Sequence, residues 1–498
     1  MHYYSYISLF LYFAVMLAIG LFAYRKSTAN VSDYLLGGRK VSPQVTALSA
    51  GASDMSGWML MGLPGAMFTV GLDIIWVAFG LLVGAFLNYL YVAPKLRGFT
   101  EFFDDALTIP DFFAKRFNKP DSSIRLISAT VIIIFFTLYT SSGLVAGGKL
   151  FESSFGLDYQ LGLLVTASIV VAYTVLGGFL AVSLTDFVQG CIMFVALVLV
   201  PVVAFFNFDS LADLNQAGFS TIAGFDQFIA NATILGVISS MAWGLGYFGQ
   251  PHIIVRFMAV RSVSDIKTTR RIGMSWMSVT LIGALATGFT GVAYINKFNV
   301  SLTDPETIFI YFSQVLFHPL ISGFLLAAIL AAIMSTISSQ LLVSSSSLTE
   351  DALKRFSKKE FTQSQLVVYG RVCVALVALV AAGLAWDASN SILSLVSNAW
   401  AGFGAAFGPL VLFSLYWKSL THRAAIAGML SGAATVLIWI YLPVLENEQT
   451  LSSVMYEIVP GFIVSSLTIV LVSLFDSKQT ENYRALYQSA EQKMQETY

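Results

Sequence analysis

Thirteen long apolar segments follow one another along the chain, and they constrain its fold more than any other feature. A helix needs about 20 mainly apolar residues to cross a bilayer. The segments cover residues 5–25, 42–68, 73–94, 124–148, 158–177, 183–207, 229–256, 272–295, 315–345, 366–386, 390–416, 424–443 and 455–475. Only 11% of the 498 residues are charged, whereas a soluble domain carries about 25%. We therefore expect an all-α integral membrane protein.

The lysines and arginines fall almost entirely on one side of these segments. If the N-terminus lies outside and each segment crosses once, every Lys and Arg except Lys149 and Lys297 falls in or beside an inner loop. Inner loops of membrane proteins carry an excess of these residues. The sequence therefore predicts an outer N-terminus, an inner C-terminus and an odd number of crossings. The net charge of -1 offers no basic surface for nucleic acid.

The segment at 48–58 is apolar overall but contains groups that a lipid-facing helix does not use. It carries the carboxyl group of Asp54, hydroxyl groups that include Ser56, and glycines that include Gly57. An ionisable residue inside a membrane is costly and points to function. Glycine and small polar residues there favour a broken helix whose free backbone groups line a cavity. We predict that an ion or a substrate binds at this break. A neutral Asp54 in a proton pathway is the alternative.

A second interruption lies at 243–252, where three glycines and a proline occur within ten residues. Proline and glycine both disfavour a regular helix. The glycines match G-x-G-x-x-G, but that nucleotide-binding pattern needs a preceding strand. Two interrupted helices five segments apart, in oppositely oriented halves, are typical of an inverted-repeat transporter. The alternative is that both are ordinary bundle helices with a kink.

This pattern predicts one transmembrane domain over residues 1–498. Its expected parts are an extra first span and inner loop (1–41), a first repeat (42–207), a second repeat (229–417), two added spans (418–475) and a cytoplasmic tail (476–498).

Oxygen-bearing residues also occur in the segment 315–345. Ala332, Ser335 and Thr336 are spaced to share one helix face. Two hydroxyls, together with carbonyls freed by a broken helix, would suit a hard cation such as Na⁺. Such hydroxyls also commonly bond to carbonyls of their own helix. Asp186 is another acid near a segment end, where it is either functional or a solvated inner-end residue.

Aromatic residues recur beside the two breaks, namely Trp58, Tyr139, Trp243 and Tyr247. In membrane proteins such residues are usually interfacial anchors or packing groups. Near a cavity they would instead enclose a small, partly apolar solute. The two cysteines and four histidines are scattered, so they predict neither a disulfide framework nor a metal cluster.

Several polar, glycine-rich stretches together resemble the sodium:solute symporter family, and within it the bacterial branch that carries proline. They include Ser49-Ala-Gly-Ala-Ser-Asp-Met-Ser-Gly-Trp58 and Ile329-Leu-Ala-Ala-Ile-Met-Ser-Thr336. Further matching stretches are 34–39, 60–66, 177–183, 243–252, 340–343 and 399–409. The resemblance implies a LeuT-type fold with five plus five core helices and about 13 transmembrane helices.

The resemblance also implies site residues. The expected sodium ligands are Ala52, Met55, Ala332, Ser335 and Thr336. The expected substrate-binding residues are Trp58, Tyr139, Trp243, Tyr247 and Pro251. The residues expected to be essential, or to couple Na⁺ binding to substrate binding, are Asp54, Ser56, Gly57, Arg39 and Asp186.

The predicted function is Na⁺-coupled uptake of L-proline across a bacterial cell membrane by alternating access, with Na⁺ as the coupling ion. The expected partners are L-proline, Na⁺ and the lipid bilayer. No obligate protein partner, no nucleic acid and no enzymatic activity are predicted. The alternatives are a symporter of the same family for another small solute, and a transporter-like sensor.

Overall fold

The computed structural model describes residues 3–26, 31–118, 123–224, 228, 232–353, 361–387, 391–444, 449–476 and 480–497. These residues form helices, and the only β-structure among them is two isolated bridges, Val41 with Val260 and Pro443 with Thr450. Ten helices in the described part of the chain are long and apolar enough to cross a membrane, and two shorter apolar helices cover Tyr159–Val175 and Ile234–Gly249.

The α-helices are α1 (Tyr3–Lys26), α2 (Val31–Leu36), α3 (Pro43–Asp54), α4 (Leu63–Val70), α5 (Ile74–Leu87), α6 (Ala93–Phe102), α7 (Ile109–Arg116), α8 (Ser123–Phe155), α9 (Tyr159–Phe205), α10 (Leu211–Gly218), α12 (Ile234–Met241), α13 (Pro251–Ala259), α14 (Ile266–Phe298), α15 (Ile308–Val315), α16 (Pro319–Ser346), α18 (Gln363–Leu384), α19 (Ile392–Tyr416), α20 (His422–Tyr441), α21 (Ile458–Phe475) and α22 (Thr480–Thr497). Short 3₁₀ or π turns are η1 (Gly37–Arg39), η2 (Trp58–Gly62), η3 (Gly71–Asp73), η4 (Asn88–Val92), η5 (Ala242–Gly249), η6 (Pro305–Thr307), η7 (Ser347–Leu353) and η9 (Leu451–Ser453).

Each of the thirteen predicted segments lies on one or more of these helices, although residues 229–231 and 390 fall outside the described part. Two of the segments are joined end to end in α9. Gly178 interrupts that helix with φ 60° and ψ -156°, a left-handed conformation that favours glycine.

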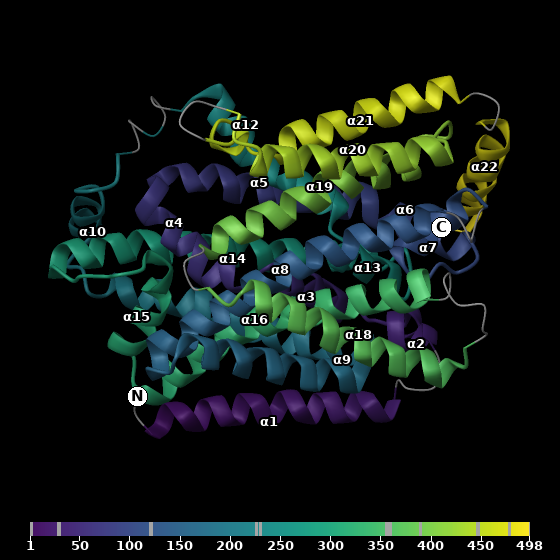
Figure 1. Cartoon of the computed structure of the whole chain (residues 1–498). Helices are drawn as coiled ribbons and strands as arrows, with labels where there is room; N and C mark the ends of the chain where they lie inside the picture. Colours follow the sequence, from purple (N-terminus) through teal and green to yellow (C-terminus); the bar gives the residue numbers. More distant parts are fainter. Residues whose placement is uncertain are drawn as a thin grey trace.

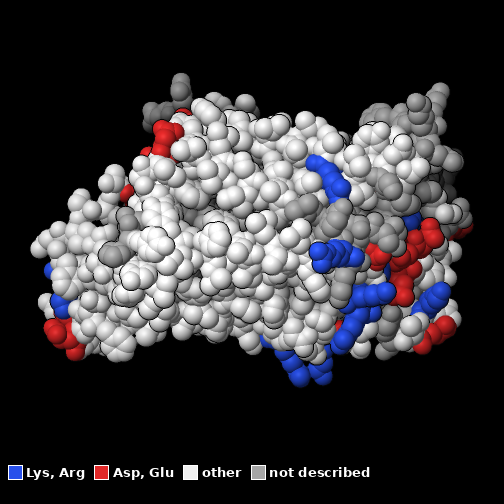
Figure 2. All heavy atoms as spheres, turned by 90° about the horizontal axis from the view of Figure 1, so that it is seen from below, with Lys and Arg blue, Asp and Glu red and all other residues white. Residues whose placement is uncertain are grey.

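The long helices run side by side as one bundle (Figure 1). Helix α1 lies along one edge and packs on α9 and α16, while α20 and α21 pack together at the opposite edge. The two ends of the chain lie at opposite ends of the bundle. On the face in Figure 2, lysines and arginines gather at the end where α22 lies, and the middle of that face has almost none. Lys119, Lys354, Arg355, Lys358, Lys359 and Lys478, which entered the orientation argument, lie outside the described residues.

The structure confirms the first interruption. Helix α3 starts with Ser42 as its N-cap and Pro43 in its first turn, and it ends at Asp54. Met55 then leaves the helical conformation with φ -84° and ψ 74°. The chain resumes as η2, followed directly by α4.

The second interruption is also confirmed. Helix α12 ends at Met241 and passes into the 3₁₀ segment η5. Gln250 is extended, with φ -80° and ψ 105°, and Pro251 opens α13. Proline suits the first turn of a helix because the N–H it lacks has no partner there. Gly246 is required within η5, because a Cβ atom there would lie 1.9 Å from Nε1 of Trp400.

The predicted polar tail forms α22, which packs across the ends of α6 and α7 (Figure 1). Tyr487 is buried there, and its hydroxyl donates to the carbonyl of Leu415 near the end of α19 (3.0 Å). Lys95 of α6 forms an ion pair with Glu491 (3.1 Å).

Candidate functional site

The break in α3 frees two backbone carbonyls. In an unbroken helix Ser56 N would donate to Ala52 O and Met59 N to Met55 O. Instead, Ser56 N donates to Asp54 O (3.0 Å) and Met59 N to Ser56 O (3.0 Å). The carbonyls of Ala52 and Met55 therefore lose their usual helical donors. These are the two backbone ligands that the resemblance implied.

Helix α16 brings hydroxyl groups to the first of these carbonyls. The Ser335 hydroxyl donates to Ala52 O (2.7 Å) and also lies 3.1 Å from Ala332 O of its own helix. The Thr336 hydroxyl lies 3.5 Å from Ala52 O and 3.3 Å from Ala332 O. All of these residues are buried. Four of the five predicted sodium ligands thus form one compact group of oxygens, as a hard cation requires.

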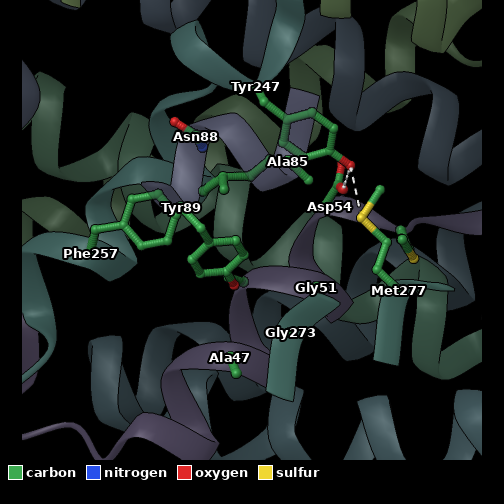
Figure 3. Close-up of a pocket in the computed structure, with 13 residues that line it drawn as sticks. Ala47, Gly51, Asp54, Ala85, Asn88, Tyr89, Tyr247, Phe257, Gly273 and Met277 are labelled. Carbon is green, nitrogen blue, oxygen red and sulfur yellow. Dashed lines mark hydrogen bonds between the residues drawn. The ribbon is translucent and has the colours of Figure 1, made fainter. Parts of the chain in front are cut away.

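Asp54 contacts the second broken segment. Its carboxylate accepts a hydrogen bond from the hydroxyl of Tyr247 in η5, and that hydroxyl also lies 4.0 Å from the sulfur of Met277 (Figure 3). The carbonyl of Asp54 accepts from the Trp58 indole N–H (3.3 Å). The side chain of Asp54 therefore connects the first helix break to the second.

A small cavity lies beside this connection. It is bounded by α3, α5, η4, η5, α13 and α14 and lined by Asp54, Asn88, Tyr89 and Tyr247 among others (Figure 3). Its volume of about 20 Å³ is room for about one water molecule and far too small for an amino acid.

The aromatic residues predicted to bind substrate are all buried in this conformation. Trp58 and Tyr247 meet at Asp54, whereas the Trp243 ring stacks on Tyr456 at 5.1 Å. The Tyr139 ring approaches His252 edge-on at 5.8 Å, directly after Pro251. Trp243 and Tyr456 also line a larger cavity of about 680 Å³, so the cluster borders a space from which a solute could approach.

Trp400 of α19 is a further member of this cluster that we did not single out as a site residue from the sequence. Its indole N–H donates to the carbonyl of Trp243 (2.7 Å), and its own carbonyl accepts from Gln250 (3.1 Å). The Tyr247 ring meets its ring edge-on at 5.1 Å. Trp400 thus braces both sides of the second break. Its position within the glycine-rich stretch 399–409 was the available signal.

The comparisons with known proteins agree with this geometry. The model of the sodium:solute symporter family matches residues 34–432. The chain belongs to the sodium:solute symporter family. It is 55% identical over 479 residues to the osmoregulated proline transporter OpuE of Bacillus subtilis, with 96% of each chain covered. It is 53% identical over 478 residues to sodium/proline symporter 2 of Staphylococcus saprophyticus, covering 95% of this chain and 93% of that one.

Solved structures show the fold of this symporter. A Na⁺-coupled sialic acid symporter in a substrate-bound outward-open state superimposes with a TM-score of 0.81, at 18% identity, covering 95% of this chain and 98% of that one. MHP1, a transporter of the nucleobase-cation-symport-1 family, gives a TM-score of 0.54 at 13% identity, with 93% and 99% covered. The chain is therefore an all-helical, multi-pass membrane protein with the fold of Na⁺-coupled symporters.

Asp186 of the symporter is not a solvated inner-end residue, so that interpretation was wrong. It is fully buried within α9. Its carboxylate accepts from the Ser49 hydroxyl (2.7 Å) and forms an ion pair with Arg256 of α13 (3.1 Å). Arg256 itself was counted from the sequence only among the inner positive charges, yet it is 1% exposed. Nothing in its local sequence distinguished it from a loop arginine at a segment end.

Arg39 joins several segments at one end of the bundle. Its guanidinium donates to the carbonyls of Met258 (2.6 Å) and Ala106 (2.7 Å), and forms an ion pair with Asp105 (2.6 Å). Burial lowers the pKa of Arg39 below its ordinary value, and the Asp105 carboxylate opposes that shift. Beside it, the bridge between Val41 and Val260 joins the start of α3 to the end of α13. Arg39 therefore lies where the start of α3 meets the end of α13.

Proposed function

We propose that the chain is a secondary transporter that couples inward Na⁺ movement to uptake of L-proline across the bacterial cell membrane, and that it is not an enzyme. The observation that carries the proposal is the oxygen group shared by α3 and α16, with Ser335 2.7 Å from the freed carbonyl of Ala52. The names of relatives more than 50% identical over nearly the whole chain support proline as the solute.

The proposed architecture is a LeuT-type inverted repeat with thirteen crossings, an outer N-terminus and an inner C-terminus. The first repeat would span 42–207 and the second 229–417, each beginning with its broken helix. The opposite placement of the two chain ends and the gathering of positive charge near α22 support this orientation.

In the proposed cycle, Na⁺ from outside binds between the α3 break and α16. Ala52, Met55 and Ala332 would supply carbonyl oxygens, and Ser335 and Thr336 hydroxyl oxygens. The ion can favour the substrate-ready state only if it binds that state more tightly than the others. Coupling to the solute would pass through Asp54, because its carboxylate accepts from Tyr247 on the other broken segment.

The proposed solute pocket is the aromatic cluster around Trp58, Tyr139, Trp243 and Tyr247. Ring faces would pack on the pyrrolidine ring of proline. Backbone N–H groups at the start of α13, which opens at Pro251, would meet the carboxylate.

The available driving force is ample for uptake. One charge moving through 100 mV is worth about 2.3 kcal/mol, and a tenfold Na⁺ gradient about 1.4 kcal/mol. With one ion per solute, these support roughly 500-fold accumulation.

The decisive experiment is uptake of labelled proline into proteoliposomes with and without an inward Na⁺ gradient. We expect accumulation only with the gradient, and an increase when the interior is made negative. Uptake that is indifferent to Na⁺ would refute the proposal. Competition by other amino acids and small solutes tests the solute separately. If another solute outcompetes proline strongly, the chain is a Na⁺ symporter for that solute.

A further inference from the structure

A buried guanidinium lies between the helices that hold the proposed ion site. Arg256 donates from Nε to the Ser49 hydroxyl (3.1 Å) and from Nη2 to Asp186 (3.1 Å). It also donates to the hydroxyl of Ser339 and to the carbonyl of His252. One side chain of α13 therefore contacts α3, α9 and α16 at one level, that is, at one depth along the bundle.

This level is about one helical turn inward from the ion ligands. On α16, Ser339 follows Ser335 by four residues, so the two share a helix face. On α3, Ser49 precedes Ala52 by three residues, again on one face and toward the start of α3, which is the inner end in the proposed orientation. The two helices that would hold the ion therefore continue inward as a pair of walls. The hydroxyl group on each wall is bonded to Arg256.

The ion pair with Asp186 makes a cation tolerable at this depth. A buried unpaired charge is strongly destabilising, whereas a paired and hydrogen-bonded one is accepted. The Phe179 ring lies 5.6 Å from the Arg256 guanidinium and shields it further. The result is a fixed positive charge in a low-dielectric region, directly on the inward side of the site proposed for Na⁺. Charges of the same sign repel far more strongly there than in water.

We propose that Arg256 is the plug on the inward side of the Na⁺ site: it closes the route between α3 and α16 by its bulk and its charge. This rests on the proposed function, because it assumes that Na⁺ binds at Ala52, Ser335 and Thr336. The ion can leave inward only when α13 withdraws the guanidinium from Asp186 and both serines. Exit of Na⁺ is thereby tied to movement of the second broken segment, which also carries Tyr247 of the proposed solute pocket.

A purely structural role would give a different result. If Arg256 only holds α13 against α9, its loss lowers stability and maximal uptake but leaves Na⁺ flux dependent on proline. If it is the plug, its loss opens a path for Na⁺ without proline. The test is therefore influx of radioactive Na⁺ into voltage-clamped proteoliposomes, with and without proline.

We expect Arg256→Gln to raise proline-independent Na⁺ influx at least about tenfold over the wild type, which corresponds to about 1.4 kcal/mol in the barrier. Arg256→Lys, which keeps the charge, should restore most of the block. Arg116→Gln is the matched control, because Arg116 is also fully buried but lies in α7, where it bonds to the carbonyl of Ser414. It should cause no Na⁺ leak. A proline-independent influx in Arg256→Gln no higher than in the wild type would overturn the proposal.

A second variant covers the case in which Arg256→Gln does not fold. Ser49→Ala combined with Ser339→Ala removes two bonds to the guanidinium and almost no volume. It should raise the leak measurably, and an unchanged leak in the folded variant would also overturn the proposal. Failure of the proposed function looks different, because wild-type protein would then show no Na⁺-driven proline uptake at all.

Discussion

Replacing Ser335 by Ala should weaken Na⁺ activation of proline uptake by a predictable amount. The Ser335 hydroxyl lies 2.7 Å from Ala52 O and 3.1 Å from Ala332 O, and it is fully buried. Its removal takes away one of about five oxygen ligands without replacing it by water. A buried interaction with a charged partner contributes about 1.5–3 kcal/mol. The Na⁺ concentration for half-maximal uptake should therefore rise about tenfold to a hundredfold.

The assay is initial proline uptake into proteoliposomes over a wide range of external Na⁺ at fixed membrane potential. Uptake by Ser335→Ala should recover toward the wild-type rate at saturating Na⁺, because the solute pocket is untouched. Ser346→Ala is the matched control, since Ser346 is a buried serine of the same helix whose hydroxyl donates to Val343 O of its own turn (2.8 Å). It should leave the Na⁺ dependence unchanged. If Ser335→Ala lowers only the maximal rate and the Na⁺ dependence does not shift, the assignment of this hydroxyl is refuted.

Three further predictions concern the two breaks. Asp54→Asn should abolish or severely weaken Na⁺-driven uptake, because it removes the charge that accepts from η5; a normal Na⁺ dependence in uptake assays would count against this. Trp243→Ala should raise the proline concentration for half-maximal uptake at least about tenfold, the effect of losing about 1.4 kcal/mol of aromatic packing, since this ring also lines a cavity of about 680 Å³; a fall in protein abundance alone would favour a packing role. Gly246→Ala should prevent accumulation of folded protein, because the new Cβ would lie 1.9 Å from Trp400 Nε1. Gly383→Ala is the control, because a Cβ there would meet no atom within 4 Å. It should raise helix stability by up to about 1 kcal/mol in thermal unfolding.

Much of the fold was predictable because a bilayer restricts what the chain can do. Apolar length located the helices, since backbone groups in hydrocarbon must bond within their own helix. The two breaks were predictable for the converse reason. Asp54 in one segment and Pro251 with its neighbouring glycines in the other cannot belong to continuous lipid-facing helices.

The members of the site that were missed act across helices. Arg256 lies at a segment end, where sequence alone cannot distinguish a buried arginine from a solvated one. Its role depends on Asp186, 70 residues away. Trp400 lies 157 residues from the carbonyl it braces, so no local pattern joins the two. Helix α22 packs on the bundle through Tyr487, whose hydroxyl donates to Leu415 of α19. The polar sequence of α22 did not suggest this contact.

The hydrogen bond from Ser335 to Ala52 bears directly on how the ion would act. The hydroxyl proton of Ser335 satisfies a carbonyl that the break in α3 has freed. For both oxygens to face a bound Na⁺, the Ser335 O–H would keep its proton and turn it away from Ala52 O, freeing the oxygen lone pairs for the ion. Because these atoms already bond to each other, ion binding replaces one α3–α16 connection by a stronger one instead of creating it from separated groups. The gain is a difference between two bonded states, which favours moderate affinity and therefore release inside the cell. On this argument Ser335→Cys, a weaker donor and a poor ligand for a hard cation, should weaken Na⁺ activation about as much as Ser335→Ala, whereas Ser335→Thr should retain it.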